Sequence, residues 1–71
     1  MDFQDFRVIK TGSKDIESFY IEVYKGDDFL IASGSYNFCT NWAHLETECD
    51  FLYDTDDLVN AIEDRTIRIT A

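Results

Sequence analysis

The 71-residue chain carries 15 Asp and Glu residues against 6 Lys and Arg residues, which gives a formal net charge of −9. This length suits one small domain, residues 1–71, and leaves no room for a second core or a deep catalytic cleft. A hydrophobic content of 45% is too high for a disordered acidic tail, and the charge disfavours nucleic acid and anionic membranes as direct partners.

The first half of the chain predicts three β-strands. Residues 4–11 alternate loosely between apolar and polar side chains, and residues 19–25 alternate clearly and are rich in β-formers. Gly26, followed by two aspartates, suits a short hairpin connection to a third strand over residues 29–35. Gly34 suggests a bulge in that strand or its end.

The strand over residues 19–25 has two distinct faces. One face carries Phe19, Ile21 and Val23, and the other carries Tyr20, Glu22 and Tyr24. The two tyrosines are exposed aromatics available to a partner, residues covered by the helices, or residues that only edge the core.

Residues 38–52 fit two patterns. A helix places one narrow apolar arc on Phe38, Trp42, Leu45, Cys49 and Leu52. A strand sets one apolar series against one polar series, namely Ala43, Leu45, Cys49 and Phe51 against His44, Glu46, Glu48 and Asp50. The length of the stretch favours the helix, and the strand remains open.

The last part of the chain predicts a helix and a short strand. Asp54 or Thr55 can cap a helix whose buried stripe is Leu58, Val59 and Ile62. Residues 66–70 alternate as a final strand. The predicted fold is α+β, an antiparallel β-meander of three strands plus a short C-terminal strand, with one or two helices packed on one face in the order β-β-β-α-α-β.

Catalytic and metal chemistry finds little support. His44 is the only histidine, and its spacing from Cys39 and Cys49 matches no zinc motif. Acid pairs on an open helix face would ionise normally, since no apolar pocket separates their pKa values. The acids near residue 54 lack the glycine and distal glutamate of a calcium loop. We therefore expect no enzyme activity, no cofactor and no bound metal.

The acidic residues are concentrated in one stretch. Residues 26–64 contain no Lys or Arg, and their acids together with Tyr53 are the predicted partner-binding residues: Asp27, Asp28, Glu46, Glu48, Asp50, Tyr53, Asp54, Asp56, Asp57, Glu63 and Asp64. Carboxylates four residues apart on a helix lie about 6 Å apart, close to the spacing of successive phosphates. The stretch thus predicts either a surface that fills a phosphate-binding groove or one that only confers solubility.

In size, charge and element order the chain resembles the acidic, phage-encoded anti-CRISPR inhibitors of Cas9 that act as DNA mimics. The resemblance runs through four segments: Phe6-Arg7-Val8, the 20–36 hairpin, Tyr53-Asp54-Thr55-Asp56-Asp57 and Thr66-Ile67-Arg68-Ile69. It implies that the acids at 27–28 and 50–57 occupy a cleft that otherwise reads the PAM, pairing with arginines and lysines that hold duplex DNA.

These patterns together predict a non-enzymatic inhibitor that binds the basic nucleic-acid-binding surface of a CRISPR-Cas effector. An antitoxin- or immunity-like module against a basic toxin is the alternative, as is a small host-takeover or structural phage protein. The N-terminus shows no signal-peptide pattern and two cysteines are too few for a disulfide framework. We therefore expect a monomer in the cytoplasm of an infected bacterial host.

Overall fold

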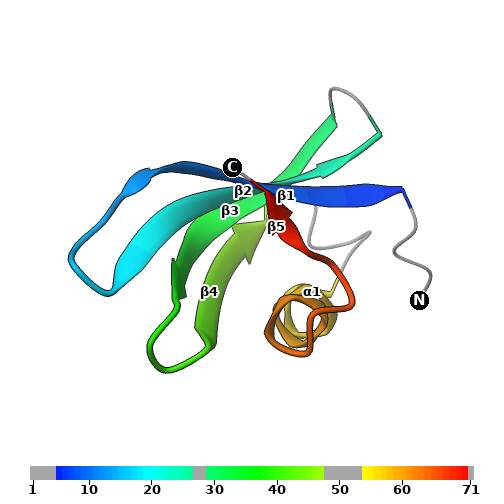
Figure 1. The fold of residues 1–71 in the computed structure, drawn as a ribbon. Helices are drawn as coiled ribbons and strands as arrows, with labels where there is room; N and C mark the ends of the chain where they lie inside the picture. The colour runs from blue at the N-terminus through cyan, green and yellow to red at the C-terminus, as the bar shows by residue number, and fades with distance from the viewer. Residues whose placement is uncertain (1–4, 27–28, 48–53, 71) are drawn as a thin grey trace.

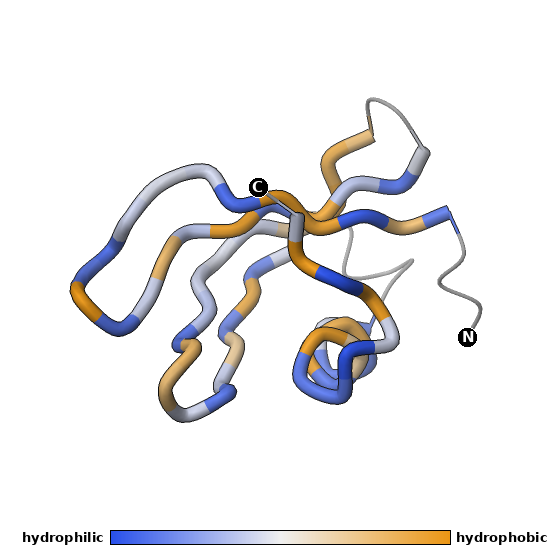
Figure 2. Tube along the Cα trace, viewed as in Figure 1, coloured by the Kyte–Doolittle hydropathy of each residue, from blue (hydrophilic) through white to orange (hydrophobic). Residues whose placement is uncertain are grey.

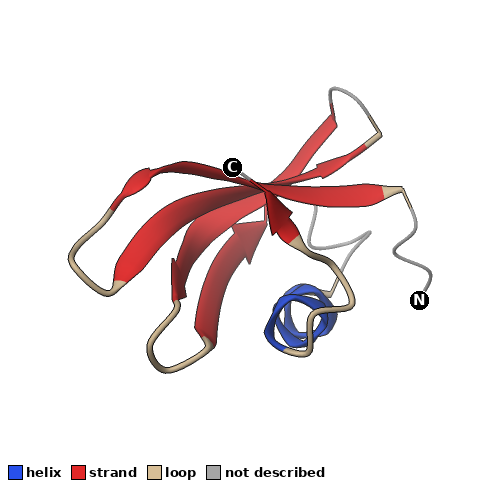
Figure 3. Cartoon of the chain, viewed as in Figure 1, coloured by secondary structure: helices blue, strands red, loops and turns tan. Residues whose placement is uncertain are grey.

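Five strands and one helix make up the part of the chain that the computed structural model describes, residues 5–26, 29–47 and 54–70. The elements in chain order are β1 (Phe6–Ser13), β2 (Ser18–Lys25), β3 (Phe29–Asn37), β4 (Trp42–Thr47), α1 (Thr55–Glu63) and β5 (Ile69–Thr70), as Figures 1 and 3 show. The α+β class is confirmed. The predicted order is wrong, because the described chain has four strands before a single helix.

The strands form one sheet in the order β4-β3-β2-β1-β5. The first four make an antiparallel meander, whereas β5 pairs in parallel with β1, Val8 lying opposite Ile69. Since β4 and β5 occupy opposite edges, the chain crosses the sheet between them, and α1 lies under one face on this crossing (Figure 1). The sheet therefore has a helix-covered face and an open face.

The helix-covered face holds the core. The largest fully buried side chains come from four elements and are Val8, Ile21, Val23, Ile31 and Leu58. Hydrophobic and hydrophilic stretches alternate along the strands and around α1 in Figure 2, which is the pattern expected where one face of each element is buried. The predicted inward side of the 19–25 strand is confirmed at Ile21 and Val23.

A β-bulge lies in β3, although not at Gly34. Val23 pairs with Ala32 and Tyr24 pairs with Leu30, so Ile31 is the extra residue. The bulge lets two consecutive residues, Ile31 and Ala32, both be buried. Gly34 instead lies within the strand, paired on both sides.

The favoured helix over residues 38–52 is wrong, and its described part forms a turn and β4. Phe38 and Trp42, which the helical arc would bury, are 51% and 60% exposed. Ala43 and Leu45 are buried, as the alternative strand pattern requires. The Asn37 side chain stabilises the turn by accepting hydrogen bonds at 2.9 Å from the amides of Cys39 and Thr40. Cys49 and Leu52 lie outside the described residues.

The predicted C-terminal helix is confirmed as α1. Asp54 is its N-cap, and the helix buries Leu58, Ala61 and Ile62. The final strand is shorter than expected, since β5 spans only Ile69–Thr70, but Ile67 ahead of it is buried.

Candidate functional site

Three predicted partner-binding acids lie together at the N-terminus of α1. The Asp54 side chain accepts a hydrogen bond from the Asp56 amide at 2.9 Å, and Asp56 and Asp57 occupy the first turn. The partial positive charge of the helix N-terminus stabilises carboxylates there. All three side chains are exposed. Within the described chain Asp56 and Asp57 form no ion pair, so their charges remain open to a partner.

Two further predicted acids, Glu63 and Asp64, make contacts inside the molecule at the other end of α1. A Glu63 carboxylate oxygen accepts a hydrogen bond from the Ala43 amide at 2.8 Å, and the Asn41 side chain donates to the Glu63 carbonyl at 2.9 Å. These bonds fasten the helix to the edge strand β4. They also offset the unfavourable placement of negative charge at a helix C-terminus.

Asp64 stabilises the loop that leaves the helix. Its carboxylate accepts hydrogen bonds from the Thr66 hydroxyl at 2.6 Å and the Thr66 amide at 3.0 Å. These bonds hold the pKa of Asp64 below its usual value of 3.8, because both favour the charged form of the carboxylate. The bond from the hydroxyl has the larger effect and the bond from the amide the smaller. Asp15 has a lowered pKa for the same reason, with Ser18 and the Glu17 amide as donors.

Glu46 lies apart from these acids. It is on β4 next to buried Leu45, so its side chain points to the open face of the sheet, away from α1. The helical placement expected for Glu46 is therefore wrong. The remaining predicted residues lie outside the described part of the chain; they are Asp27, Asp28, Glu48, Asp50 and Tyr53.

The open face carries a hollow that the sequence analysis did not identify. It measures about 430 Å³ and is lined by side chains from β2, β3 and β4 together with Thr11 and Lys14 from the β1 side. Tyr20 on its wall is 48% exposed, which agrees with the alternative that it is an exposed aromatic. The sequence feature that could have indicated this hollow is the run Ser33-Gly34-Ser35, because small residues in a central strand leave room above the sheet.

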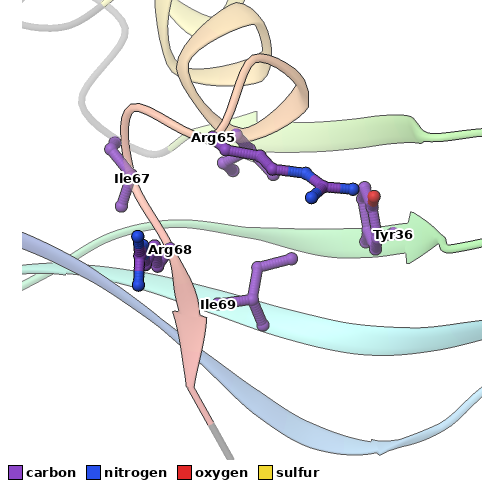
Figure 4. Close-up of a pocket in the computed structure, with 6 residues that line it drawn as sticks. Tyr36, Arg65, Ile67, Arg68 and Ile69 are labelled. Carbon is purple, nitrogen blue, oxygen red and sulfur yellow. The ribbon is translucent and has the colours of Figure 1, made fainter.

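A second hollow, of about 410 Å³, lies on the helix side of the sheet. Figure 4 shows Arg65 extending across it toward Tyr36, with Arg68 and Ile69 on the adjoining segment. Within the described chain neither arginine forms an ion pair. The basic residues that follow the acidic stretch thus line a site separate from both the N-terminus of α1 and the open face.

The described residues offer no metal site, since no cluster of three or more His, Cys, Asp or Glu side chains could hold an ion. His44 is exposed on the open face and stacks on Trp42 with ring centroids 6.0 Å apart. Cys39 is an exposed free cysteine in the turn before β4.

Comparison with known proteins gives no relative: no family model, curated protein or solved structure matches the chain. No helix in the described ranges has the length and apolar character needed to cross a bilayer. Function must therefore be argued from the surfaces described above.

Proposed function

We propose that this protein is a non-enzymatic inhibitor that binds the basic nucleic-acid-binding surface of another protein. The observation that carries the proposal is the exposed group of Asp54, Asp56 and Asp57 at the N-terminus of α1. These carboxylates lie in the stretch without Lys or Arg, on a chain of net charge −9. Protein surfaces usually intersperse both signs of charge.

The target class follows from electrostatics. Channels that hold phosphates are lined by Lys and Arg, which form short, charge-assisted hydrogen bonds to carboxylates as they do to phosphates. We propose a CRISPR-Cas effector in a bacterial cytoplasm as the specific target, with the protein acting as a phage-type inhibitor. Binding of this kind is expected to be fast and strongly dependent on salt.

The described acids do not form one continuous row. Asp54, Asp56 and Asp57 lie at one end of α1, Glu63 and Asp64 make internal contacts at the other end, and Glu46 points to the open face. We therefore propose that the N-terminus of α1 makes the principal contact, a compact patch that replaces a few phosphates.

Affinity capture from a lysate of a CRISPR-bearing bacterium tests this proposal. We expect a nucleic-acid-binding protein to be retained at low salt and released as salt rises, and to be retained poorly by the triple variant D54N/D56N/D57N. Capture of a basic toxin in its place would favour the antitoxin-like alternative. Failure to retain any basic protein, or retention that does not change at high salt, would overturn the proposal.

A further inference from the structure

The strand register builds a trough on the open face of the sheet. Across β2, β3 and β4, Glu22 lies opposite Ser33, which lies opposite Glu46. One step further along the strands, Tyr20 lies opposite Ser35, and Ser35 opposite His44. Small side chains on β3 thus run between two taller walls.

Each wall pairs an aromatic ring with a carboxylate. Residues two apart on a strand share a face and lie about 7 Å apart, and strands two apart are separated by about 10 Å. Tyr20 and Glu22 form the β2 wall, and His44 and Glu46 form the β4 wall. Trp42 extends the second wall by stacking on His44, with an interplanar angle of 26°.

The two carboxylates of the trough differ in their contacts within the molecule. The Tyr24 hydroxyl donates to one Glu22 oxygen at 2.8 Å, which orients that carboxylate. The Glu46 side chain has neither a hydrogen bond nor an ion pair within the described ranges. Lys14, at the β1 side of the hollow, is the one Lys or Arg among the lining residues that the structure describes.

We propose that this trough binds an arginine side chain of a basic partner segment. A guanidinium group stacks on aromatic rings through its plane and forms paired hydrogen bonds to carboxylates through its edge, and both kinds of partner line the trough. Exposed Tyr and Trp beside charged groups are also the residue types that dominate binding energy in protein interfaces. The volume of about 430 Å³ is in the range of sites for small groups.

The main chain of β3 cannot supply the binding, because it is already paired on both sides with β2 and β4. A partner segment in the trough is therefore held by side chains and not by addition of a strand beside β3. This inference rests on the proposed function for its partner class, and it adds a second, aromatic contact to the acidic patch at α1.

Titration with short peptides, followed by NMR of the backbone amides, tests the inference. The probes are acetyl-Gly-Arg-Gly-Arg-Gly-amide and the same peptide with lysines. We expect shift changes at Ser33, Ser35 and His44, with tighter binding of the arginine peptide. The E22Q/E46Q variant should raise the Kd about tenfold through loss of charge-assisted hydrogen bonds. The matched D5N/E17Q variant removes the same charge from two exposed carboxylates outside the trough and the α1 patch, and it should leave the Kd nearly unchanged.

Several outcomes would overturn the trough as an arginine site: equal binding of the two peptides, shifts centred on the N-terminus of α1, or an equal loss in both double variants. The captured partner separates this inference from the proposed function. If E22Q/E46Q leaves partner binding intact while D54N/D56N/D57N abolishes it, the proposed function stands and the trough has no part in it. If the peptide occupies the trough but no basic partner is captured, the proposed function fails and the trough remains an arginine site.

Discussion

Of the three glycines, Gly34 is the one at which an added methyl group would collide with neighbouring atoms. A Cβ built there would lie 1.8 Å from the carbonyl oxygen of His44 and 3.0 Å from the Leu45 Cα. Both atoms belong to the backbone of β4, which cannot move aside as a flexible side chain could. The glycine therefore sets how closely β3 and β4 approach, and it lies at the trough described above.

We predict that Gly34→Ala lowers the free energy of unfolding by about 1–3 kcal/mol, as overpacking does in a well-packed interior. Gly12→Ala is the matched control, because a Cβ at Gly12 meets no atom within 4 Å. It should leave stability within about 1 kcal/mol of the wild type. Urea denaturation of both variants measures the difference, and equal effects would show that the close approach has no energetic consequence.

The hydrogen bonds of Asp64 predict how the stability of the fold depends on pH. Its pKa is lowered in the folded state, so its contribution to stability is present above the usual value of 3.8 and is lost as the pH falls through the folded-state pKa. Thr66→Val removes the hydroxyl donor and should raise the pKa of Asp64 toward its usual value. NMR titration of the carboxyl carbon measures this shift. The melting temperatures of variant and wild type should differ at pH 7 and converge in acid. An Asp64 pKa that does not respond to Thr66→Val would contradict the assignment.

At the scale of elements, residues 38–52 show what local pattern could and could not predict. Strands β1 and β2 and helix α1 were predictable, because each buries one regularly spaced face, and β3 was predictable as the return strand of a hairpin. Strand β4 was the less favoured alternative, because Phe38, Trp42 and Leu45 also fit a helical arc. The stretch forms a strand because β3 offers it an edge to pair with. Local periodicity does not report a tertiary feature of that kind. The parallel pairing of β5 with β1 was missed for the same reason.

The candidate site was predictable only in part. Sequence alone places the Asp54 cap and the exposed acids of the first turn of α1, since these depend on neighbouring residues. It does not show that Glu63 reaches the Ala43 amide, twenty residues away. Nor does it reveal the trough, which depends on the register of three strands and on the strand pattern that was not favoured.

The contact between α1 and β4 through Glu63 predicts a loss of stability when that side chain is removed. Glu63→Ala should lower the free energy of unfolding by about 1–2 kcal/mol, because the Ala43 amide on the edge strand loses a charged acceptor. It should also speed hydrogen exchange at that amide. Asp57→Ala is the control, since it removes the same charge from the same helix but leaves the junction intact. Equal destabilisation and unchanged exchange at Ala43 would contradict a role for Glu63 in fastening the helix.

For the whole molecule, the charge is divided among separate surfaces. Acids gather at the N-terminus of α1 and along the trough, while Arg65 and Arg68 line a hollow beyond the helix C-terminus. The described residues therefore do not imitate a long DNA strand. We propose that they contact a basic partner at two places, one a compact acidic patch and the other an aromatic trough.

The triple variant D54N/D56N/D57N should separate folding from binding. Asparagine caps a helix about as well as aspartate, so the free energy of unfolding should stay within about 1 kcal/mol of the wild type. Circular dichroism and urea denaturation provide this check. A variant that unfolds would mean that the carboxylates are needed for the fold itself.

The most direct measurement is a competition between this protein and labelled nucleic acid for the captured partner. Fluorescence anisotropy of the labelled nucleic acid reports its displacement. We predict that the wild-type protein displaces the nucleic acid at low salt and that displacement weakens steeply between about 0.05 and 0.5 M salt. The D54N/D56N/D57N variant should reach the same displacement only at a concentration at least about tenfold higher, which corresponds to a loss of roughly 1.4 kcal/mol or more of binding free energy. Displacement that is equally strong for the variant and at high salt would contradict binding by these carboxylates. So would a partner that binds the protein and its nucleic acid at the same time.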